Sequence, residues 1–171
     1  MRIHVEPLTD ESFADFGCVL GEPSVAAPTI QDQVSDVWLG LSDLMGIGQA
    51  PGRQITFLKI HTRPPAYDRI EKHETSAEAF IPLEGRSILM LVPAECVDER
   101  GVPDMRHARA FLMDGSRGVL LRPATWHAVP YNLTDVATYL VLVDDAIIAK
   151  QDLHVTPIEA VEFDWGALAT G

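Results

Sequence analysis

The feature that most constrains the fold of this chain is a series of short, apolar, β-prone segments that begins after residue 52. Turn-favouring residues separate the segments, as at the Glu84-Gly85 pair. Short strands at this spacing indicate a β-sandwich or a closed barrel. The sequence therefore predicts an all-β fold with strands over Ile55–His61, Ala79–Pro82, Ser87–Val92, Ala108–Leu112, Gly118–Leu121 and Ala137–Val143.

The residues that precede these segments predict a strand over Arg2–Glu6, followed by a short helix. Thr9 can cap that helix and Gly17 can end it. Phe13 and Phe16 are three positions apart, so they share one face of the helix and can anchor it to the barrel. The other expected elements are loops over residues 21–35 and 46–52, a strand or helical turn over 34–44, and an edge strand over 151–165.

The length of 171 residues suits one domain. We expect N-terminal elements over residues 1–52, a barrel core over 53–148 and a C-terminal edge segment over 149–171. Apolar residues make up 47% of the chain, which is enough to form a sizeable core. We expect no signal peptide, because the first residues include charged side chains and lack an apolar stretch. No stretch approaches the roughly 20 apolar residues of a membrane span.

The net charge of −12 argues against nucleic acid and anionic membrane surfaces as partners, because both are bound through lysine and arginine. A small anionic substrate would need a local cluster of positive groups. The two cysteines, Cys18 and Cys96, are too few and too far apart for a disulfide framework or a cysteine zinc site. We therefore expect free thiols and a cytoplasmic location.

The first of two stretches that carry candidate chemistry has the form E-x-H-x4-E-x6-G over residues 71–85. Glu71 and His73 are two positions apart, so they point to the same face of an extended chain. Glu78 follows a short turn and can return to that face on the next strand. The spacing predicts that these side chains meet at the mouth of the barrel.

The second stretch, residues 118–127, places His127 after a glycine and a proline. Together the two stretches resemble the motifs of the cupin superfamily, a double-stranded β-helix or jelly roll, whose first motif is usually H-x-H-x3–4-E-x6-G. Glu71 stands where the first histidine is usual, whereas His73 and Glu78 match in type and order. The resemblance implies that these three residues and His127 bind one metal ion. Two imidazoles and two carboxylates suit Zn, Mn, Fe, Co or Ni, and no organic cofactor is expected.

A closer resemblance covers most of the chain. Residues 70–85 contain I-E-K-H and A-F-I-P-L-E-G, and they resemble the ureidoglycolate lyase family, which carries an E-[RK]-H-x4-Q-A-F-I-P-[ML]-x-G run. The G-V and W-H pairs of residues 118–127 and the opening residues 5–17 are similar to the same family. Glu78 stands where that family usually has glutamine, which makes the cluster more like a metal site. The family's N-terminal Arg-Tyr-His run is replaced here by residues 37–41.

The resemblance implies a carbon–nitrogen lyase that splits ureidoglycolate into glyoxylate and urea in purine (allantoin) catabolism. One carbon of this substrate bears a hydroxyl, a carboxylate and the urea nitrogen. Cleavage therefore needs a base for the hydroxyl proton and an acid for the departing nitrogen. The candidate catalytic residues are His73 and His127, as metal ligands or proton-transfer groups, and Glu78, as a ligand or the base. Glu71 is the candidate fourth ligand.

Six further residues are candidates for substrate binding. Three are cations that can pair with the substrate carboxylate, and three are aromatic residues that can form the cavity wall. The cations are Lys59, Lys72 and Arg122, and the aromatic residues are Phe80, Trp126 and Tyr131.

Two alternatives to this function stay open. One is a metal-dependent cupin isomerase, lyase or dioxygenase that acts on another small hydroxy or keto acid. The other is a non-enzymatic cupin that binds a metabolite. Metal content and urea release from ureidoglycolate distinguish the three. We also expect a homodimer, because cupin barrels commonly pair through sheet edges.

Overall fold

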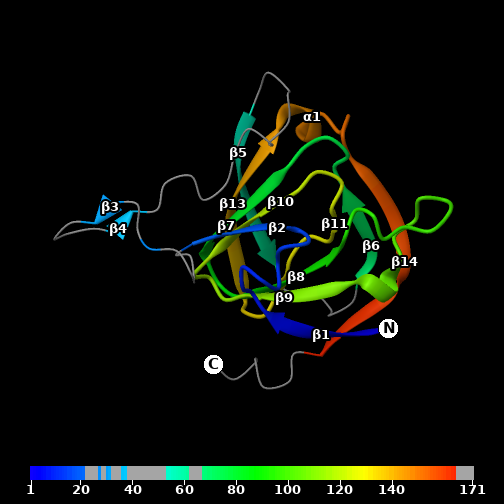
Figure 1. Ribbon diagram of the computed structural model, residues 1–171, viewed down its shortest axis with the longest axis horizontal. Coiled ribbons are helices and arrows are strands. Elements are labelled where there is room, and N and C mark those ends of the chain that lie inside the picture. Colours follow the sequence, from blue (N-terminus) through cyan, green and yellow to red (C-terminus); the bar gives the residue numbers. More distant parts are fainter. Residues whose placement is uncertain (22–26, 28–29, 32–35, 38–52, 62–66, 165–171) are drawn as a thin grey trace.

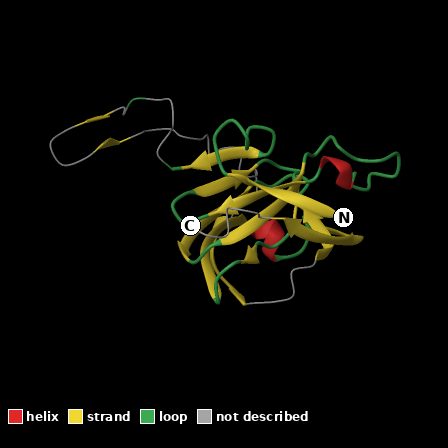
Figure 2. Cartoon of the chain, turned by 90° about the horizontal axis from the view of Figure 1, so that it is seen from below, coloured by secondary structure: helices red, strands yellow, loops and turns green. Residues whose placement is uncertain are grey.

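The computed structural model describes residues 1–21, 27, 30–31, 36–37, 53–61 and 67–164 (Figure 1). Nearly all of its regular elements are strands, as Figure 2 shows. The strands are β1 (Arg2–Pro7), β2 (Gly17–Leu20), β3 (Ile30–Gln31), β4 (Asp36–Val37), β5 (Arg53–His61), β6 (Tyr67–Lys72), β7 (Glu78–Glu84), β8 (Ser87–Val92), β9 (Arg109–Met113), β10 (Gly118–Leu121), β11 (Trp126–His127), β12 (Tyr131–Asn132), β13 (Val136–Asp144) and β14 (His154–Asp164). The described residues also form a 3-10 turn, η2 (Met105–His107), and a short helix, α1 (Asp145–Ile148). Among the described residues, no helix has the length and apolar character that a membrane crossing requires.

The strands form two main sheets. The larger has the order β11-β6-β14-β1-β9-β8-β12, and β11 also pairs with β8. This additional pairing closes the larger sheet into a ring. The five-stranded sheet β2-β10-β7-β13-β5 packs against one side of the ring, and β3 and β4 form a separate two-stranded sheet. Figure 1 shows β5 and β13 on one side of the molecule and β6 and β14 on the other. The predicted all-β fold is confirmed.

Alternation of side chains along the strands creates two cores. In β8, Leu89 and Leu91 belong to the core between the ring and the five-stranded sheet, whereas Ile88 and Met90 belong to the core inside the ring. A strand that is buried on both faces has a nearly continuous apolar sequence. The sequence of β8, S-I-L-M-L-V, has this character, and all six residues are buried. The inter-sheet core also contains Phe80 and every second residue of β13, namely Ala137, Tyr139, Val141 and Val143.

Six strands were predicted from apolar segments, and all six are present as β5, β7, β8, β9, β10 and β13. β8 and β10 have the predicted bounds, and β1 ends one residue later than expected. The predicted turn at Gly85 links β7 of the five-stranded sheet to β8 of the ring. Gly85 has a φ of +83°, and a Cβ there would lie 2.3 Å from the carbonyl oxygen of Val136, so this corner requires glycine.

The short helix expected after Thr9 is instead a run of turns over residues 10–16. Ser12 Oγ donates to the carbonyl oxygen of Pro7 at 3.0 Å, and the Ser12 N–H donates to Thr9 Oγ1 at 3.0 Å. The bond to Thr9 Oγ1 is the cap expected of Thr9, whereas the Ser12 hydroxyl ties the turns back to the end of β1. Phe13 and Phe16 are nevertheless buried in the inter-sheet core, as the expected anchoring role requires.

The C-terminal strand β14 is not the edge strand that the sequence suggested, because it lies between β6 and β1. It pairs with β6 from His154 to Pro157 and again at Val161, and it pairs with β1 from Glu162 onward. Pro157 cannot donate a main-chain hydrogen bond, and it occupies the part of the strand that has one neighbour. The expected loop over residues 21–35 contains β3, and the expectations for residues 38–52 lie outside the described part of the chain.

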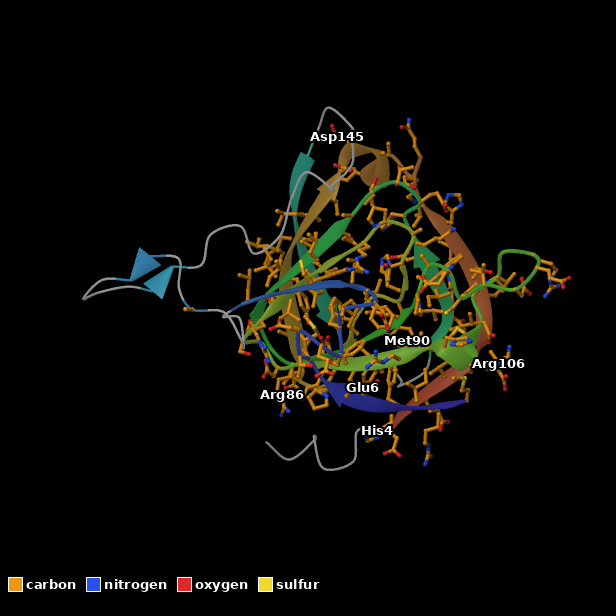
Figure 3. The ribbon with its side chains drawn as sticks, in the orientation of Figure 1. His4, Glu6, Arg86, Met90, Arg106 and Asp145 are labelled. Carbon is orange, nitrogen blue, oxygen red and sulfur yellow. The ribbon has the colours of Figure 1, made fainter. Side chains whose placement is uncertain are left out.

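Arg109 of β9 forms an ion pair with β1, its neighbouring strand in the ring. Its Nε and Nη2 atoms donate to the two carboxylate oxygens of Glu6 on β1 at 2.9 Å and 2.6 Å. Figure 3 labels Glu6 on β1, at the end of the molecule opposite Asp145 of α1. The guanidinium also lies over the rings of Phe16 and Phe111, at 5.7 Å and 5.1 Å from their centroids. The two-bond ion pair between Arg109 and Glu6, together with the contact on Phe16, therefore links β9 to β1 and to the turn before β2.

Candidate active site and metal centre

The structure brings together all four residues that the sequence singled out as a cluster. Glu71 is on β6, His73 follows that strand directly, Glu78 begins β7, and His127 ends β11. Glu71 and His127 are register partners, which places both side chains on the face that meets the five-stranded sheet. Glu78 enters from that second sheet, because β7 belongs to it. The cluster therefore lies where the ring and the five-stranded sheet meet.

Three of the four side chains are more buried than a barrel mouth implies. His73 is 4% exposed, Glu78 8% and His127 1%, whereas the side chain of Glu71 is 29% exposed. Glu78 Oε2 lies 3.1 Å from His127 Nε2 and 3.5 Å from His73 Nε2. Glu71 Oε1 lies 3.7 Å from His127 Nε2. The cluster is thus a pair of imidazoles that share one buried carboxylate, with a second carboxylate toward solvent.

Each imidazole is oriented by a main-chain carbonyl. His73 Nδ1 lies 2.6 Å from the carbonyl oxygen of Asp152, and His127 Nδ1 lies 3.1 Å from that of Thr125. A carbonyl oxygen only accepts hydrogen bonds, so each Nδ1 carries the hydrogen. In the neutral rings, this leaves each Nε2 with a lone pair that faces the cluster, which is the form that binds metals or accepts a proton.

The electrostatics of the cluster are dominated by Glu78. Burial alone would raise the pKa of this carboxyl, but its close contacts and charge interactions with His127 and His73 outweigh burial and lower the pKa to about 2. For His73, burial would lower the pKa, but the contacts with Glu78 outweigh it and raise the pKa above its ordinary value. Glu78 is therefore ionised at neutral pH, and its charge favours a cation beside it.

The donor set fits a divalent metal ion. Glu78 Oε2 and His127 Nε2 are buried without a well-directed hydrogen bond, although only 3.1 Å separates them. Buried polar atoms without such bonds are costly, and a cation between them would satisfy both. Ligand atoms of Glu71, His73 and His127 lie within 4.8 Å of one another. Imidazole and carboxylate ligands suit several transition metals, so the set does not select one.

A cavity of about 240 Å³ opens beside the cluster. It is lined by residues 67–71 of β6 and by residues 127–129. Glu71 and His127 are the two cluster residues that reach this cavity, and Arg69 contributes a guanidinium to its lining. The cavity is large enough for a small organic acid, and it exposes a carboxylate, an imidazole and a cation to such a ligand.

The three predicted cations do not line this cavity. Lys59 is exposed on β5, and Arg122 is exposed and donates to the carbonyl oxygen of Asp15 at 3.4 Å. Lys72 is paired with Glu74, and its Nζ lies 5.0 Å from the ring centroid of Trp126. The side chains of all three residues therefore lie away from the cavity wall.

The three predicted aromatic residues are all buried. The ring centroid of Phe80 lies 6.2 Å from that of His127, so Phe80 forms a wall of the cluster. Trp126 and Tyr131 belong to the core inside the ring, where Tyr131 packs 6.0 Å from Phe163. The ring of Phe80 thus contacts a residue of the cluster.

Two residues of this region were not anticipated from the sequence. Arg69 lies two positions before Glu71 on the same strand, so the strand period alone could have placed it near the cluster. Asp152, which accepts the hydrogen bond from His73 Nδ1, is distant in sequence and is brought to the site by the fold. No local pattern identifies such a residue.

Comparison with known proteins assigns the family. A family model described as "Ureidoglycolate lyase" matches residues 1–163. The ureidoglycolate lyase of Rhodobacter capsulatus is 36% identical over 132 residues, which cover 75% of this chain and 77% of the relative. Ureidoglycolate lyase 1 of Rhizobium meliloti is 27% identical over 142 residues, which cover 82% of this chain and 81% of the relative.

Among solved structures, similarity is found to an oxalate decarboxylase of Bacillus subtilis, a protein with Mn(II) centres, at 16% identity and a TM-score of 0.39. The match covers 64% of this chain and 23% of that much longer one. The whole-chain family match and the relative that is 36% identical decide the assignment. This chain belongs to the ureidoglycolate lyase family.

Proposed function

We propose that this protein cleaves ureidoglycolate into glyoxylate and urea, and that the buried cluster is its active site. The observation that carries the proposal is the contact of both imidazoles with Glu78 Oε2, beside a cavity that reaches Glu71 and His127. The family assignment supplies the substrate class. The same assignment supports a role in purine (allantoin) catabolism.

The reaction moves one proton from oxygen to nitrogen. As the substrate hydroxyl loses its proton, a carbon–oxygen double bond forms, the carbon–nitrogen bond breaks, and the departing urea nitrogen takes up a proton. His127 is placed to accept the hydroxyl proton, because its Nε2 faces the cluster and the residue lines the cavity. Glu78 stabilises the resulting imidazolium, and the same proton can then pass to the nitrogen. General acid–base catalysis of this kind contributes about 10²–10⁴-fold.

Glu78 is better suited to stabilising charge than to acting as the essential base. Its pKa of about 2 makes it a weak base. The family resemblance described above places glutamine at this position in most members, and glutamine cannot accept a proton in this way. Glu71, His73 and His127 are the cluster residues that the chain shares with that pattern. We therefore assign proton transfer to the imidazoles and Glu71.

We also propose that Glu71, His73, Glu78 and His127 can hold a divalent metal ion. Bound there, the ion would supply Lewis acidity toward an oxygen of the substrate. With the ion bound, His73, His127 and Glu78 would be ligands, and Glu71, the carboxylate that is most accessible from the cavity, would be the group left for proton transfer when it does not itself bind the ion. Metal analysis of the purified protein distinguishes the metal-bound form from the metal-free form, in which His127 accepts the proton.

Arg69 is the residue that we propose to bind the substrate carboxylate. It lines the cavity together with Glu71 and His127. Its side chain is 72% exposed and forms an ion pair with Asp68 at 3.0 Å. A guanidinium offers two parallel N–H donors that match a carboxylate, and an exposed pair of this kind is weak enough to exchange partners.

The test is an assay of urea and glyoxylate release from ureidoglycolate, made on the purified protein before and after chelation. Equal release of both products supports the lyase proposal, and loss of release after chelation with recovery on metal addition supports the metal-dependent form. Absence of urea release in both states would rule out the proposed reaction. Tightly bound stoichiometric metal without urea release favours a metal-dependent cupin enzyme that acts on another hydroxy or keto acid. The additional carboxylate of Glu78 is the feature that favours this second candidate.

The homodimer is proposed on the outer face of the five-stranded sheet. Phe57 of β5 and Leu83 of β7 are 60% and 55% exposed there. Leu140 of β13 is the register partner of both Phe57 and Ile81, so apolar side chains continue across the three strands. Exposed apolar surface of this kind is typical of protein interfaces. Light scattering on the wild type and on Phe57→Ser tests the dimer.

A cytoplasmic location is proposed as well, because the free thiols of Cys18 and Cys96 suit a reducing compartment.

A further inference from the structure

Asp152 occupies the turn between α1 and β14, and it is 6% exposed. Its main-chain carbonyl oxygen accepts a hydrogen bond from His73 Nδ1 at 2.6 Å. Its carboxylate accepts the main-chain N–H groups of Glu74 at 2.6 Å and Thr75 at 3.1 Å, as well as the Thr75 hydroxyl at 2.9 Å. One residue thus binds both the imidazole of His73 and the two residues that follow it.

The turn that presents Asp152 is itself tightly held. Lys150 has a φ of 56°, in the left-handed region that a non-glycine residue adopts rarely. The N–H groups of Gln151 and Asp152 both donate to the carbonyl oxygen of Ala146 in α1, at 2.9 Å and 3.2 Å. The position of the Asp152 carbonyl is therefore fixed from the side of α1 as well as from the side of His73.

We infer that Asp152 is a positioning residue of the site, which fixes the ring orientation and the tautomer of His73 by clamping residues 73–75 onto the end of α1. The inference rests on the proposed role of His73 in the cluster. The carbonyl keeps the hydrogen on Nδ1, so that Nε2 faces Glu78. The carboxylate holds the start of the loop that runs from His73 to Glu78.

The carboxylate is suited to this task because charge-assisted hydrogen bonds are the stronger kind. Burial alone would raise its pKa, but hydrogen bonds from Ser76, Thr75 and Glu74 outweigh burial and hold the pKa below its ordinary value. The clamp is therefore intact at neutral pH. Partners that orient a ligating histidine in this way affect metal affinity or activity by about 10–100-fold when they are removed.

The test compares Asp152→Ala and Asp152→Asn with a matched control, Asp98→Asn. Asp98 also clamps a loop, through the N–H groups of Arg100 and Val102 at 2.8 Å and 2.9 Å, but no atom of the cluster contacts it. The first measurement is the imidazole ¹⁵N spectrum of the metal-free protein, recorded at a pH at which His73 is neutral. The second is the Kd for Zn²⁺, measured by competition with a chelating dye.

In the wild type and in Asp98→Asn, we expect His73 to carry its hydrogen on Nδ1. In Asp152→Ala we expect a mixture of tautomers and a Kd for Zn²⁺ that is about 10–100-fold weaker. Asp152→Asn keeps one acceptor oxygen and should give an intermediate result. If Asp152→Ala does not fold, Asp152→Asn and Thr75→Val, which removes only one donor to the carboxylate, supply the same comparison.

An unchanged His73 tautomer and an unchanged Kd in the folded Asp152 variants would overturn the inference. An equal effect of Asp98→Asn would overturn it too, because a general loss of stability would then explain both. The tautomer measurement needs neither catalysis nor metal. If the wild type releases no urea but Asp152→Ala shows the expected change in the His73 tautomer, the proposed reaction is refuted and the role of Asp152 is supported.

Discussion

Glu78 Oε2 lies 3.1 Å from His127 Nε2, and this buried contact joins the five-stranded sheet to the ring. The same oxygen lies 3.5 Å from His73 Nε2. A single buried carboxylate thus contacts both imidazoles. Replacing it with glutamine, which has nearly the same shape, removes the charge that raises the pKa of His73 and leaves the fold in place.

Glu78→Gln is expected to lower the pKa of His73. Burial already acts to lower this pKa, and contact with the Glu78 carboxylate is the main cause that raises it. The pKa is measured by NMR titration of the metal-free protein. Glu84→Gln, at the exposed end of the same strand, is the matched control. A His73 pKa that stays the same in Glu78→Gln would show that other groups set it.

His127→Asn is expected to reduce kcat/KM for ureidoglycolate by at least about 10²-fold, because asparagine cannot accept the hydroxyl proton. The measurement is the rate of urea release, with circular dichroism to confirm that the variant is folded. His4→Asn, on the exposed side of β1, should retain wild-type activity. Nearly full activity in His127→Asn would remove this residue from the mechanism.

Arg69→Gln is expected to raise KM more than it lowers kcat, because the guanidinium is proposed to bind the carboxylate and not to transfer protons. The control is Arg2→Gln, whose side chain is 69% exposed and forms a loose pair with Glu162 at 3.8 Å. Steady-state kinetics of the two variants give the comparison. An unchanged KM in Arg69→Gln would show that another part of the protein binds the substrate carboxylate.

Glu6→Gln is expected to lower the free energy of unfolding by about 1 kcal/mol at neutral pH. The Arg109 hydrogen bond is the largest cause that holds the pKa of Glu6 below 4.5, and burial partly opposes it. A depressed folded-state pKa stabilises the protein above the unfolded value, and this contribution is lost as the pH falls through the folded-state pKa. Urea denaturation should therefore show a difference between variant and wild type that shrinks below pH 4.5. A difference that does not depend on pH would contradict the ionic contribution.

Gly85→Ala is expected to destabilise the protein by more than Gly101→Ala. Both glycines have positive φ, +83° and +76°, so both substitutions incur the cost of about 1–3 kcal/mol for a left-handed residue. A Cβ at Gly85 also meets the Val136 carbonyl oxygen at 2.3 Å, whereas nothing lies within 4 Å of a Cβ at Gly101. Denaturant unfolding measures both changes. Equal destabilisation would mean that the corner at Gly85 relaxes without cost.

Strands with one or two apolar faces were predictable, because the alternation of apolar side chains and the turn residues at their ends identify them from local sequence. β8 is such a case, with its continuous apolar run. β6 was not predicted as a strand, although it carries Glu71, because Asp68, Arg69 and Lys72 make its sequence polar. Its strand conformation depends on pairing with β14 and β11, which are distant in sequence.

The convergence of Glu71, His73, Glu78 and His127 was predictable from spacing and from family resemblance. The three predicted cations, Lys59, Lys72 and Arg122, do not line the cavity beside this cluster. Lys59 alternates with Leu58 and Ile60, which face the core, so the strand period places Lys59 outside. Asp152 could not be found from any local pattern, since its hydrogen bond to His73 joins residues that only the tertiary structure brings together.

The ring of the larger sheet has one further consequence. β11 closes it with two residues, Trp126 and His127, which pair with β6 on one side and β8 on the other. The histidine proposed for proton transfer is thus half of the strand that completes the circle. Opening of the ring at the seam between β11 and β6 separates His127 from Glu71 at the same moment. The lifetime of that seam therefore sets an upper limit on the lifetime of a competent site.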